Sequence, residues 1–291
     1  MRGWRRVRRR VAGCQRISCG RTVADPVGRS RPASSDCSRA DRDASSGREL
    51  SDHGRSNPGS PALALFDLDF TLIPSDSGLR WARFLVGEGV LAPGTDEAYL
   101  DVCRGYVAGR IAIDALHRFA AERLLAVALE DVAALQDRFE AVIRHELPAA
   151  SRELVARHQE AGDLCCIVTT TNEIVARPFA RAFGIPHLLG SQPVIEQERF
   201  TGAYAGPLCH GAAKVARVEA WLRGRAVEAS GAVEAGAPAP VAGFRQRVFY
   251  SDSSSDLPLL EWVDAPTVVR PDASLRAHAE ARGWPIIERL A

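Results

Sequence analysis

Residues 62–72 read ALALFDLDFTL, and this stretch decides the fold expected for the chain. Its first five residues form an apolar run that ends at Asp67, which is typical of a strand buried on both faces of a parallel sheet. Two similar runs end at polar residues: LCCIV at 164–168 is followed by Thr169, and VFY at 248–250 by a serine and an aspartate. Parallel strands of an open α/β sheet bind ligands at their carboxyl ends, so these strand ends should share one site.

Helical patterns separate these strands. Apolar residues recur at three- and four-residue steps through most of the stretch from about Ser77 to Glu146, which predicts several consecutive helices. Shorter helices are expected at 149–161, 173–183, 212–222 and 256–262, with half a hairpin at 200–204 and another strand at 267–269. The pattern predicts an α/β protein: a Rossmann-like parallel sheet core with helices on both faces, plus an inserted all-helical cap domain.

The chain accordingly divides into three parts. Residues 61–76 and 148–291 are expected to form the α/β core, and residues 77–147 the helical cap. Residues 1–60 are expected to be a disordered, arginine-rich extension, because they hold few large apolar side chains to bury. Residues 225–245, RAVEASGAVEAGAPAPVAGFR, are rich in Ala, Gly and Pro and favour a flexible surface insertion within the core.

Charge and cysteine content exclude some classes of protein. Residues 1–60 hold 14 arginines and 6 acidic residues, and since the whole chain is +1, residues 61–291 carry −7. A body of that sign is not expected to bind nucleic acid, although the arginine-rich head leaves a nucleic-acid or membrane-binding arm as an alternative. No apolar run reaches the length of about 18 residues that a membrane span needs. The seven cysteines lack metal-ligand spacing and favour a reducing, cytoplasmic location; the oligomeric state is left open.

Four carboxylates follow two of the predicted strands: Asp67 and Asp69 after the first, Asp252 and Asp256 after the strand at 248. Brought together without compensation, they would repel one another and raise one another's pKa values. A hard cation with oxygen ligands and open water positions is the expected compensation, which favours Mg²⁺. Lys214 is the only lysine beside 36 arginines, and it indicates a site that requires a compact positive charge.

These elements, in this order, resemble the four motifs of the haloacid dehalogenase superfamily: DxDxT at 67–71, a strand ending at Thr169, a single Lys214, and SDSSSD at 251–256. The helical insert between the first two motifs is similar to the phosphoserine-phosphatase-like branch of that superfamily. The resemblance covers about residues 62–290. Within the first motif, Phe70 departs from the Asn, Ser or His that is common at its position.

The resemblance implies a role for each carboxylate. Asp67 would be the nucleophile that forms an aspartyl-phosphate, and Asp69 the general acid and then the base. An acid two residues after the nucleophile marks a phosphatase rather than a dehalogenase. Mg²⁺ would be held by Asp67, Asp252 and the backbone carbonyl of Asp69. Lys214 would balance negative charge at the nucleophile, and Asp256 would orient Lys214.

Phosphate and substrate contacts are implied in the same way. The Thr169 side chain and the backbone N–H of Thr170 would bind phosphoryl oxygens near a helix N-terminus. Asp76 stands where phosphoserine phosphatases carry an acid that contacts the substrate amine, but it can equally cap the following helix. Asn172 is expected to be a helix cap and His210 a surface residue.

The expected substrate is a small phosphorylated metabolite that bears an amine. An ungapped comparison puts Ala120 where phosphoserine phosphatases use an arginine for the serine carboxylate, with Arg118 and Arg123 nearby. A substrate carboxylate would then be poorly compensated, which favours histidinol phosphate. Phosphoserine is the alternative, because an ungapped comparison through helices can slip by a turn. A non-catalytic phospho-ligand-binding protein of the same fold is a further alternative.

Overall fold

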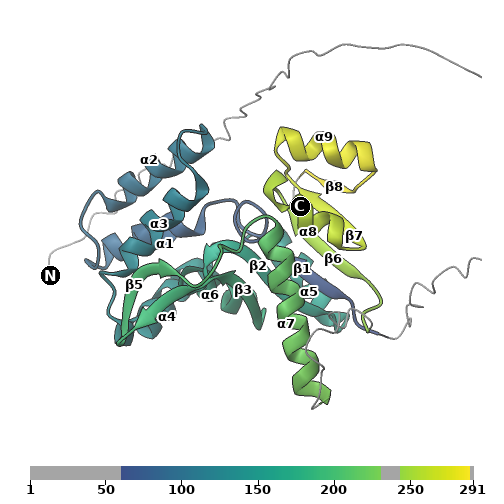
Figure 1. The fold of residues 1–291 in the computed structure, drawn as a ribbon, viewed down its shortest axis with the longest axis horizontal. Coiled ribbons are helices and arrows are strands. Elements are labelled where there is room, and N and C mark those ends of the chain that lie inside the picture. Colours follow the sequence, from purple (N-terminus) through teal and green to yellow (C-terminus); the bar gives the residue numbers. More distant parts are fainter. Residues whose placement is uncertain (1–59, 231–242, 289–291) are drawn as a thin grey trace, which may run out of the picture.

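A computed structural model describes residues 60–230 and 243–288 of the chain. Within them, six strands form one sheet in the order β3-β2-β1-β6-β7-β8, and every neighbouring pair is parallel (Figure 1). The strands are β1 (Leu63–Phe66), β2 (Leu164–Asn172), β3 (His187–Ser191), β6 (Arg247–Ser251), β7 (Ala265–Val269) and β8 (Ile286–Ile287). The predicted parallel α/β core is confirmed.

The short strand β1 lies in the middle of the sheet, between β2 and β6. All four of its residues are fully buried, as its unbroken apolar run predicts. Phe66 at its end pairs with Ile167 of β2 and with Tyr250 of β6. The carboxyl ends of these three strands therefore lie next to one another.

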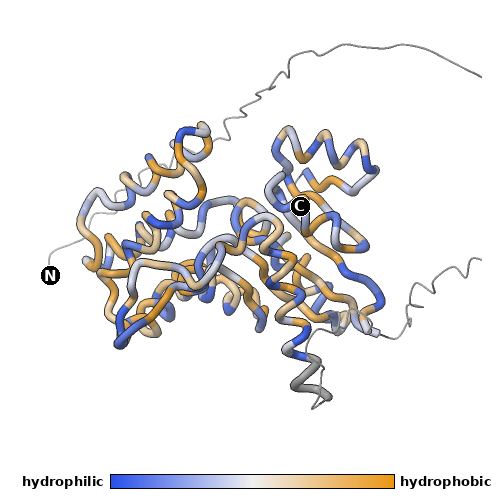
Figure 2. Tube along the Cα trace, in the orientation of Figure 1, coloured by the Kyte–Doolittle hydropathy of each residue, from blue (hydrophilic) through white to orange (hydrophobic). Residues whose placement is uncertain are grey.

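Helices cover both faces of the sheet. Successive side chains of β1 point to opposite faces: Ala64 and Phe66 join a hydrophobic cluster with α5 (Ala149–Glu160) and α6 (Glu173–Ala182). Leu63 and Leu65 join a second cluster with α7 (Ala212–Ser230), α8 (Leu257–Trp262) and α9 (Ala273–Arg282). Figure 2 shows the corresponding concentration of hydrophobic residues along the central strands.

The helices predicted between the first two strands are present as α1 (Ser77–Gly87), α2 (Thr95–Val107), α3 (Ile113–Leu124) and α4 (Val132–Arg144). Figure 1 shows α1, α2 and α3 grouped on one side of the molecule, away from α8 and α9. Trp81 of α1 packs edge-on against Phe139 of α4, which packs edge-on against Phe179 of α6. Aromatic contacts thus tie the insert to the sheet layer, and the domain limits at 77 and 147 stay a prediction.

Two sequence predictions need correction or limits. Residues 225–230 belong to α7, so the flexible insertion predicted at 225–245 is wrong for them; Ala, Glu and Arg favour helix strongly enough to extend it. At the other end of that insertion, Arg245 is anchored by an ion pair with Asp163 at 2.8 Å. The rest of the insertion, at 231–242, and the arginine-rich head before Ser60 lie outside the described residues.

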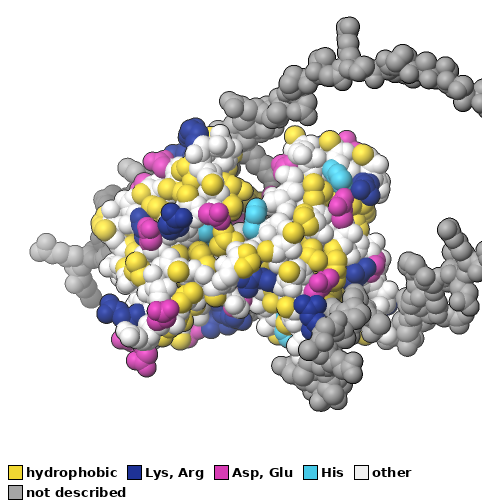
Figure 3. Space-filling model, in the orientation of Figure 1, with side chains coloured by type: hydrophobic (Ala, Val, Ile, Leu, Met, Phe, Trp, Pro, Cys, Tyr) yellow, Lys and Arg dark blue, Asp and Glu magenta, His cyan; other side chains and the backbone are white. Residues whose placement is uncertain are grey.

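A small antiparallel hairpin, β4 (Pro193–Glu196) and β5 (Arg199–Tyr204), follows β3, and its second strand is the one predicted at 200–204. It reaches the insert, because the Tyr204 hydroxyl donates a hydrogen bond to the backbone carbonyl of His117 on α3 (3.2 Å). Acidic and basic side chains are interspersed over the face shown in Figure 3. Over the described ranges, we find no helix with both the length and the apolar character to cross a membrane.

Candidate active site

Asp67 is the first residue after β1, and its side chain lies almost entirely buried at the carboxyl edge of the sheet. Its backbone N–H donates to the Tyr250 carbonyl (2.9 Å), which extends the β1–β6 pairing by one residue. Lys214, in the first turn of α7, is 1% exposed and donates from Nζ to Asp67 Oδ1 (2.9 Å) and Asp256 Oδ2 (2.7 Å). The structure thus brings the lone lysine between two carboxylates from different strand ends.

The charges in this cluster are not balanced. Burial, followed by the carboxylates of Asp256 and Asp69, raises the pKa of Asp67 to about 7 even though Lys214 lowers it. Burial alone would lower the pKa of Lys214, but Asp256 and Asp67 outweigh it and raise that pKa above its ordinary value. Lys214 therefore stays charged, while the carboxylates around it lack a full set of positive partners.

A second buried atom shows the same shortage. Ser251 donates to Asp256 Oδ2 (2.7 Å), the oxygen that also accepts from Lys214. The other oxygen, Asp256 Oδ1, is buried and has no hydrogen-bond partner among the described residues. A buried carboxylate oxygen without a partner is costly, so an ion or an ordered water is the expected neighbour.

Thr71 joins the two strand ends. Its hydroxyl lies 3.3 Å from Asp67 Oδ2 and 3.2 Å from Asp252 Oδ1, and it has only one hydrogen to donate. Asp67 and Asp252 therefore present oxygens to the same small region. This oxygen-only donor set fits Mg²⁺. The described residues hold no cluster of three His, Cys, Asp or Glu side chains placed for one metal ion, and the expected set contains only two carboxylates, with a backbone carbonyl as the third ligand.

The loop that carries Thr71 has an unusual backbone. Phe70 adopts the left-handed conformation, with φ of 58°, which residues other than Gly and Asn seldom take. Arg270 holds this loop in place, because its Nη2 donates to the backbone carbonyls of Phe70 (2.8 Å) and Thr71 (2.9 Å). Arg270 follows β7 and carried no signal in the sequence that linked it to the first motif.

Asp69 faces the insert. Its Oδ1 accepts from the Ser77 N–H at the start of α1 (2.6 Å), and its Oδ2 accepts from the Thr171 hydroxyl (2.7 Å). Burial, followed by the nearby carboxylate of Asp76, raises the pKa of Asp69 to about 6. Asp69 is therefore a carboxyl group that can both give and take a proton near neutral pH.

Asp76 is the N-cap of α1, since its Oδ1 accepts from the Leu79 N–H (2.7 Å). It also faces Tyr99 of α2, and burial raises its pKa. The Tyr99 hydroxyl comes so close to α1 that a Cβ at Gly78 would lie 2.1 Å from it. Asp76 therefore caps α1 and also faces α2.

The three threonines that follow the apolar part of β2 continue the strand, which runs to Asn172 rather than ending at 168. Pairing with β3 is irregular between Val168 and Asn172. Thr169 is 1% exposed and accepts from the Thr171 N–H (3.2 Å). Asn172 caps α6 by accepting from the Val175 N–H (3.1 Å), as the sequence predicts.

His210 corrects the sequence prediction. It was expected on the surface, but it is half-buried, and its Nδ1 lies 3.5 Å from the Thr170 hydroxyl. The loop that carries it leads directly into α7 and Lys214, so the same turn places both side chains near the strand ends. The sequence held only the short spacing between these two residues as a signal.

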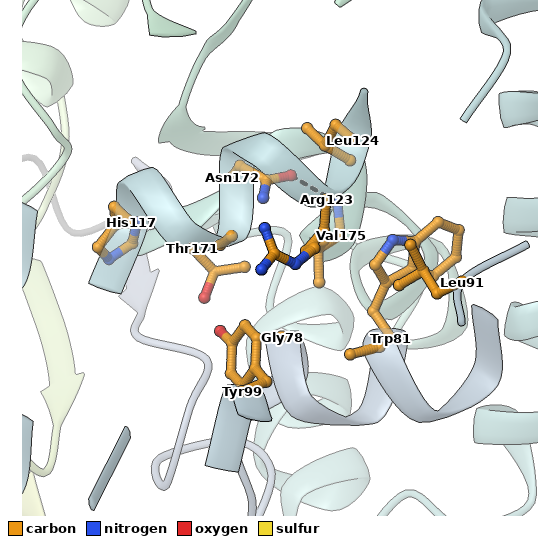
Figure 4. Close-up of a pocket in the computed structure, with 12 residues that line it drawn as sticks. Gly78, Trp81, Leu91, Tyr99, His117, Arg123, Leu124, Thr171, Asn172 and Val175 are labelled. Carbon is orange, nitrogen blue, oxygen red and sulfur yellow. Dashed lines mark hydrogen bonds between the residues drawn. The ribbon is translucent and has the colours of Figure 1, made fainter. Parts of the chain in front are cut away.

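A pocket opens beside Asp69, between α1, α2 and α3 of the insert and the junction of β2 with α6 (Figure 4). It is lined by Gly78, Trp81, Ala82, Leu91, Tyr99, His117, Ala120, Arg123, Leu124, Thr171, Asn172 and Val175. Ala120 and Arg123 share this lining, whereas Arg118 lines a neighbouring groove beside β5. Tyr99 and His117 were missed in the sequence, where they read as ordinary helix positions.

The model of the haloacid dehalogenase-like hydrolase family matches residues 64–261, which include the carboxyl ends of β1, β2 and β6. The chain belongs to the haloacid dehalogenase-like hydrolases. This hydrolase is 35% identical to a histidinol-phosphatase of Neisseria meningitidis, over 77% of this chain and 97% of the relative. It is 28% identical to a probable phosphatase of Mycobacterium tuberculosis, over 80% of this chain and 77% of that one.

Solved structures agree with the fold of the hydrolase. A protein of unknown function from Bordetella pertussis is 37% identical, with a TM-score of 0.70 over 80% of this chain and all of that one. A substrate-bound phosphoserine phosphatase is 15% identical, with a TM-score of 0.53 over 79% of this chain and 93% of its own. The second likeness concerns the fold alone.

Proposed function

We propose that the hydrolase is a Mg²⁺-dependent phosphoric monoester hydrolase that forms an aspartyl-phosphate on Asp67. The observation that carries this proposal is the buried Lys214, which holds one oxygen of Asp67 and one of Asp256. A nucleophilic carboxylate fixed by a buried ammonium is suited to attack phosphorus. Family membership and phosphatase-named relatives support the same reaction class.

The chemistry divides between two carboxylates. An oxygen of Asp67 attacks phosphorus, and the bond to the leaving oxygen breaks as Asp69 gives that oxygen its proton. Asp69 then takes a proton from water, whose oxygen attacks phosphorus and releases phosphate from Asp67. A pKa of about 6 at Asp69 suits both steps.

Mg²⁺ would be held by Asp67, Asp252 and the backbone carbonyl of Asp69. When bound, it supplies positive charge that lets an anionic nucleophile approach an anionic phosphate. The proximity of Asp67 and Asp252 to one hydroxyl, and the unpartnered oxygen of Asp256, support this assignment. Asp256 would keep Lys214 in place.

Thr169 and the backbone N–H of Thr170 would bind the phosphoryl oxygens. The irregular pairing of β2 with β3 at these residues and the nearby start of α6 support this role. We further propose that residues 77–147 act as the cap over this site, and we place the enzyme in the cytoplasm on its cysteine pattern.

Histidinol phosphate is the substrate we propose, since the relative with that activity in its name matches along nearly its whole length. Asp76 would receive the substrate ammonium. Phosphoserine is the second candidate, favoured by Arg123, whose guanidinium lies in the pocket where a carboxylate would need it (Figure 4). The Arg123 guanidinium also stacks on Phe119 at 3.8 Å and pairs with Glu122 at 3.3 Å. The ion pair with Glu122 partly neutralises its charge and so weakens its attraction for a substrate carboxylate.

The first test is phosphate release from a panel of small monoesters, including both candidates, with and without Mg²⁺. Asp67→Asn should lower the rate by at least about a thousandfold, because the amide is a poor nucleophile. Asp101→Asn, which changes an exposed carboxylate on α2, should leave the rate unchanged.

No turnover by folded, Mg²⁺-loaded protein on the whole panel would contradict the proposal. Tight binding of a beryllium fluoride or vanadate phosphoryl mimic without any turnover would instead support the non-catalytic phospho-ligand binder.

A further inference from the structure

His117 is a buried histidine that lines the pocket beside Asp69. It lies on α3 and is 8% exposed. Its backbone carbonyl accepts from the Tyr204 hydroxyl, and its ring meets the Tyr204 ring at 67° with centroids 6.0 Å apart. The hairpin therefore fixes the position of this part of α3 and of the imidazole.

The Nδ1 atom of His117 is buried and has no hydrogen-bond partner among the described residues. Leaving a buried polar atom unpaired in this way destabilises the fold. The residue before it on α3, Leu116, is equally buried and apolar, so burial at this place in the helix does not itself call for a polar side chain. A histidine at the pocket wall is thus explained most simply by a bound group that completes its hydrogen bonding.

The charge state of His117 limits what that group can be. Burial, followed by the neighbouring His210, lowers the pKa of His117 to about 4, although Asp114 opposes this shift. The imidazole is therefore neutral near pH 7, so it donates or accepts a hydrogen bond without adding charge. It offers no charge to a carboxylate.

The remaining pocket lining is largely apolar. Trp81, Leu91 and Leu124 supply apolar walls. At the end nearest the site, Thr171 lines the pocket and donates to Asp69, the proposed acid for the leaving oxygen. A leaving group that enters this pocket would start at Asp69 and reach toward His117.

We propose that His117 determines substrate specificity by hydrogen bonding to a neutral ring nitrogen of the leaving group. The inference rests on the proposed function and narrows it to phosphate monoesters of amino alcohols that carry a heteroaromatic ring. Asp76 would receive the ammonium of such a substrate. Phosphoserine, which has a carboxylate in place of the ring, gains no charge pairing from the neutral His117.

The test compares three esters: histidinol phosphate, phenylalaninol phosphate, which keeps the ammonium and a flat ring without nitrogens, and phosphoserine. The wild-type enzyme should prefer histidinol phosphate over phenylalaninol phosphate in kcat/KM by about tenfold, as one hydrogen bond allows. His117→Leu should abolish this preference, mainly through a higher KM for histidinol phosphate. His117→Asn keeps a donor and an acceptor near Nδ1 and should therefore retain part of the preference. His145→Leu is the control, because it changes an exposed histidine, and it should retain the whole preference.

Equal losses on all three esters would overturn the inference, since a structural role predicts them. An unchanged preference in His117→Leu would also overturn it, while leaving the phosphatase proposal intact. If the wild-type enzyme hydrolyses none of the three, the proposed substrate class fails and this inference with it. Thermal unfolding of each variant checks that it is folded. If His117→Leu does not fold, His117→Asn becomes the test. The inference would then be overturned by a His117→Asn variant that keeps the full preference and the melting temperature of the wild-type enzyme.

Discussion

At the scale of single residues, removal of the Lys214 ammonium would leave the buried carboxylates of Asp67 and Asp256 without their positive partner. Its ammonium is almost inaccessible to water and faces two buried carboxylates. Loss of one partner from a buried ion pair is far more costly than the pair itself is stabilising. The side chain is thus needed for folding as well as for the proposed chemistry.

Lys214→Met should abolish phosphate release and lower the free energy of unfolding by about 3–5 kcal/mol near neutral pH. Without the ammonium, the folded-state pKa of Asp67 rises further, so the variant should be least stable above that pKa and recover stability as the carboxyls protonate in acid. Urea unfolding at two pH values measures this. A loss of the same size at both would contradict the electrostatic explanation.

Phe70 adopts a left-handed backbone conformation that is unfavourable for its residue type. Its left-handed backbone costs roughly 1–2 kcal/mol for an ordinary residue, whereas Asn tolerates this conformation well. Phe70→Asn should therefore raise the free energy of unfolding by up to about 1 kcal/mol, measured by urea denaturation. Phe70→Leu, which keeps an apolar side chain without that tolerance, is the control, and an equal gain in both variants would point away from the backbone.

At the scale of elements, the sequence predicts best where one face or both faces of an element are buried. Apolar residues mark the positions that become buried when the protein folds. This is why the apolar runs predict β1, β2 and β6 and the helical periodicity predicts α1 to α4. The sequence analysis missed β3 and β8, which are the two edge strands of the sheet. They have five and two residues, and these carry too few apolar positions to be recognised as strands. α7 (Ala212–Ser230) extends beyond the helix expected at 212–222, and residues of high helix propensity continue past that point.

Helices α1 and α2 approach each other closely at Gly78 and Tyr99. A methyl group at Gly78 would collide with the Tyr99 hydroxyl, so Gly78→Ala should destabilise the protein by about 1–3 kcal/mol. In a Tyr99→Leu background the same change should cost much less, because the colliding atoms are gone. A double-mutant cycle of unfolding free energies measures the coupling, and additive effects would show that the two helices do not depend on this approach.

At the scale of the whole molecule, the site is assembled from segments that are far apart in the chain. The convergence of Asp67 and Asp252 was predictable because both follow parallel strands whose carboxyl ends meet at one sheet edge, and Lys214 was placed there by the resemblance to the four motifs. The pocket around His117 and Tyr99 was not, because it depends on how α2 and α3 settle against the core, and no local pattern encodes that arrangement. Residues that bind a ligand through packing geometry leave weak traces in a single sequence.

Bound Mg²⁺ should stabilise the whole fold in a pH-dependent way. The folded-state pKa values of Asp67 and Asp69, about 7 and about 6, lie above the ordinary value, so both hold their protons more tightly in the folded chain. Their stabilisation is present below about pH 4 and is lost as pH rises through those values. Mg²⁺ would bind the deprotonated carboxylates of Asp67 and Asp252, so it should raise the melting temperature more at about pH 8 than at about pH 5.

Differential scanning fluorimetry with and without Mg²⁺ at both pH values measures this effect. Asp252→Asn should remove most of the gain, whereas Asp101→Asn should keep it. An equal gain at both pH values would argue against ion binding at these carboxylates.

The aromatic chain from Trp81 through Phe139 to Phe179 has a consequence for substrate entry. If α1 and α4 swung outward together about pivots near 76 and 148, these rings would be exposed to water at roughly 1.5–3 kcal/mol each. Beside them, α2 packs through the smaller cluster around Tyr99, whereas α3 is also held by Leu124 in the large core cluster and by the hydrogen bond from Tyr204. Any opening of the pocket that keeps these rings buried must therefore leave α1 and α4 in place.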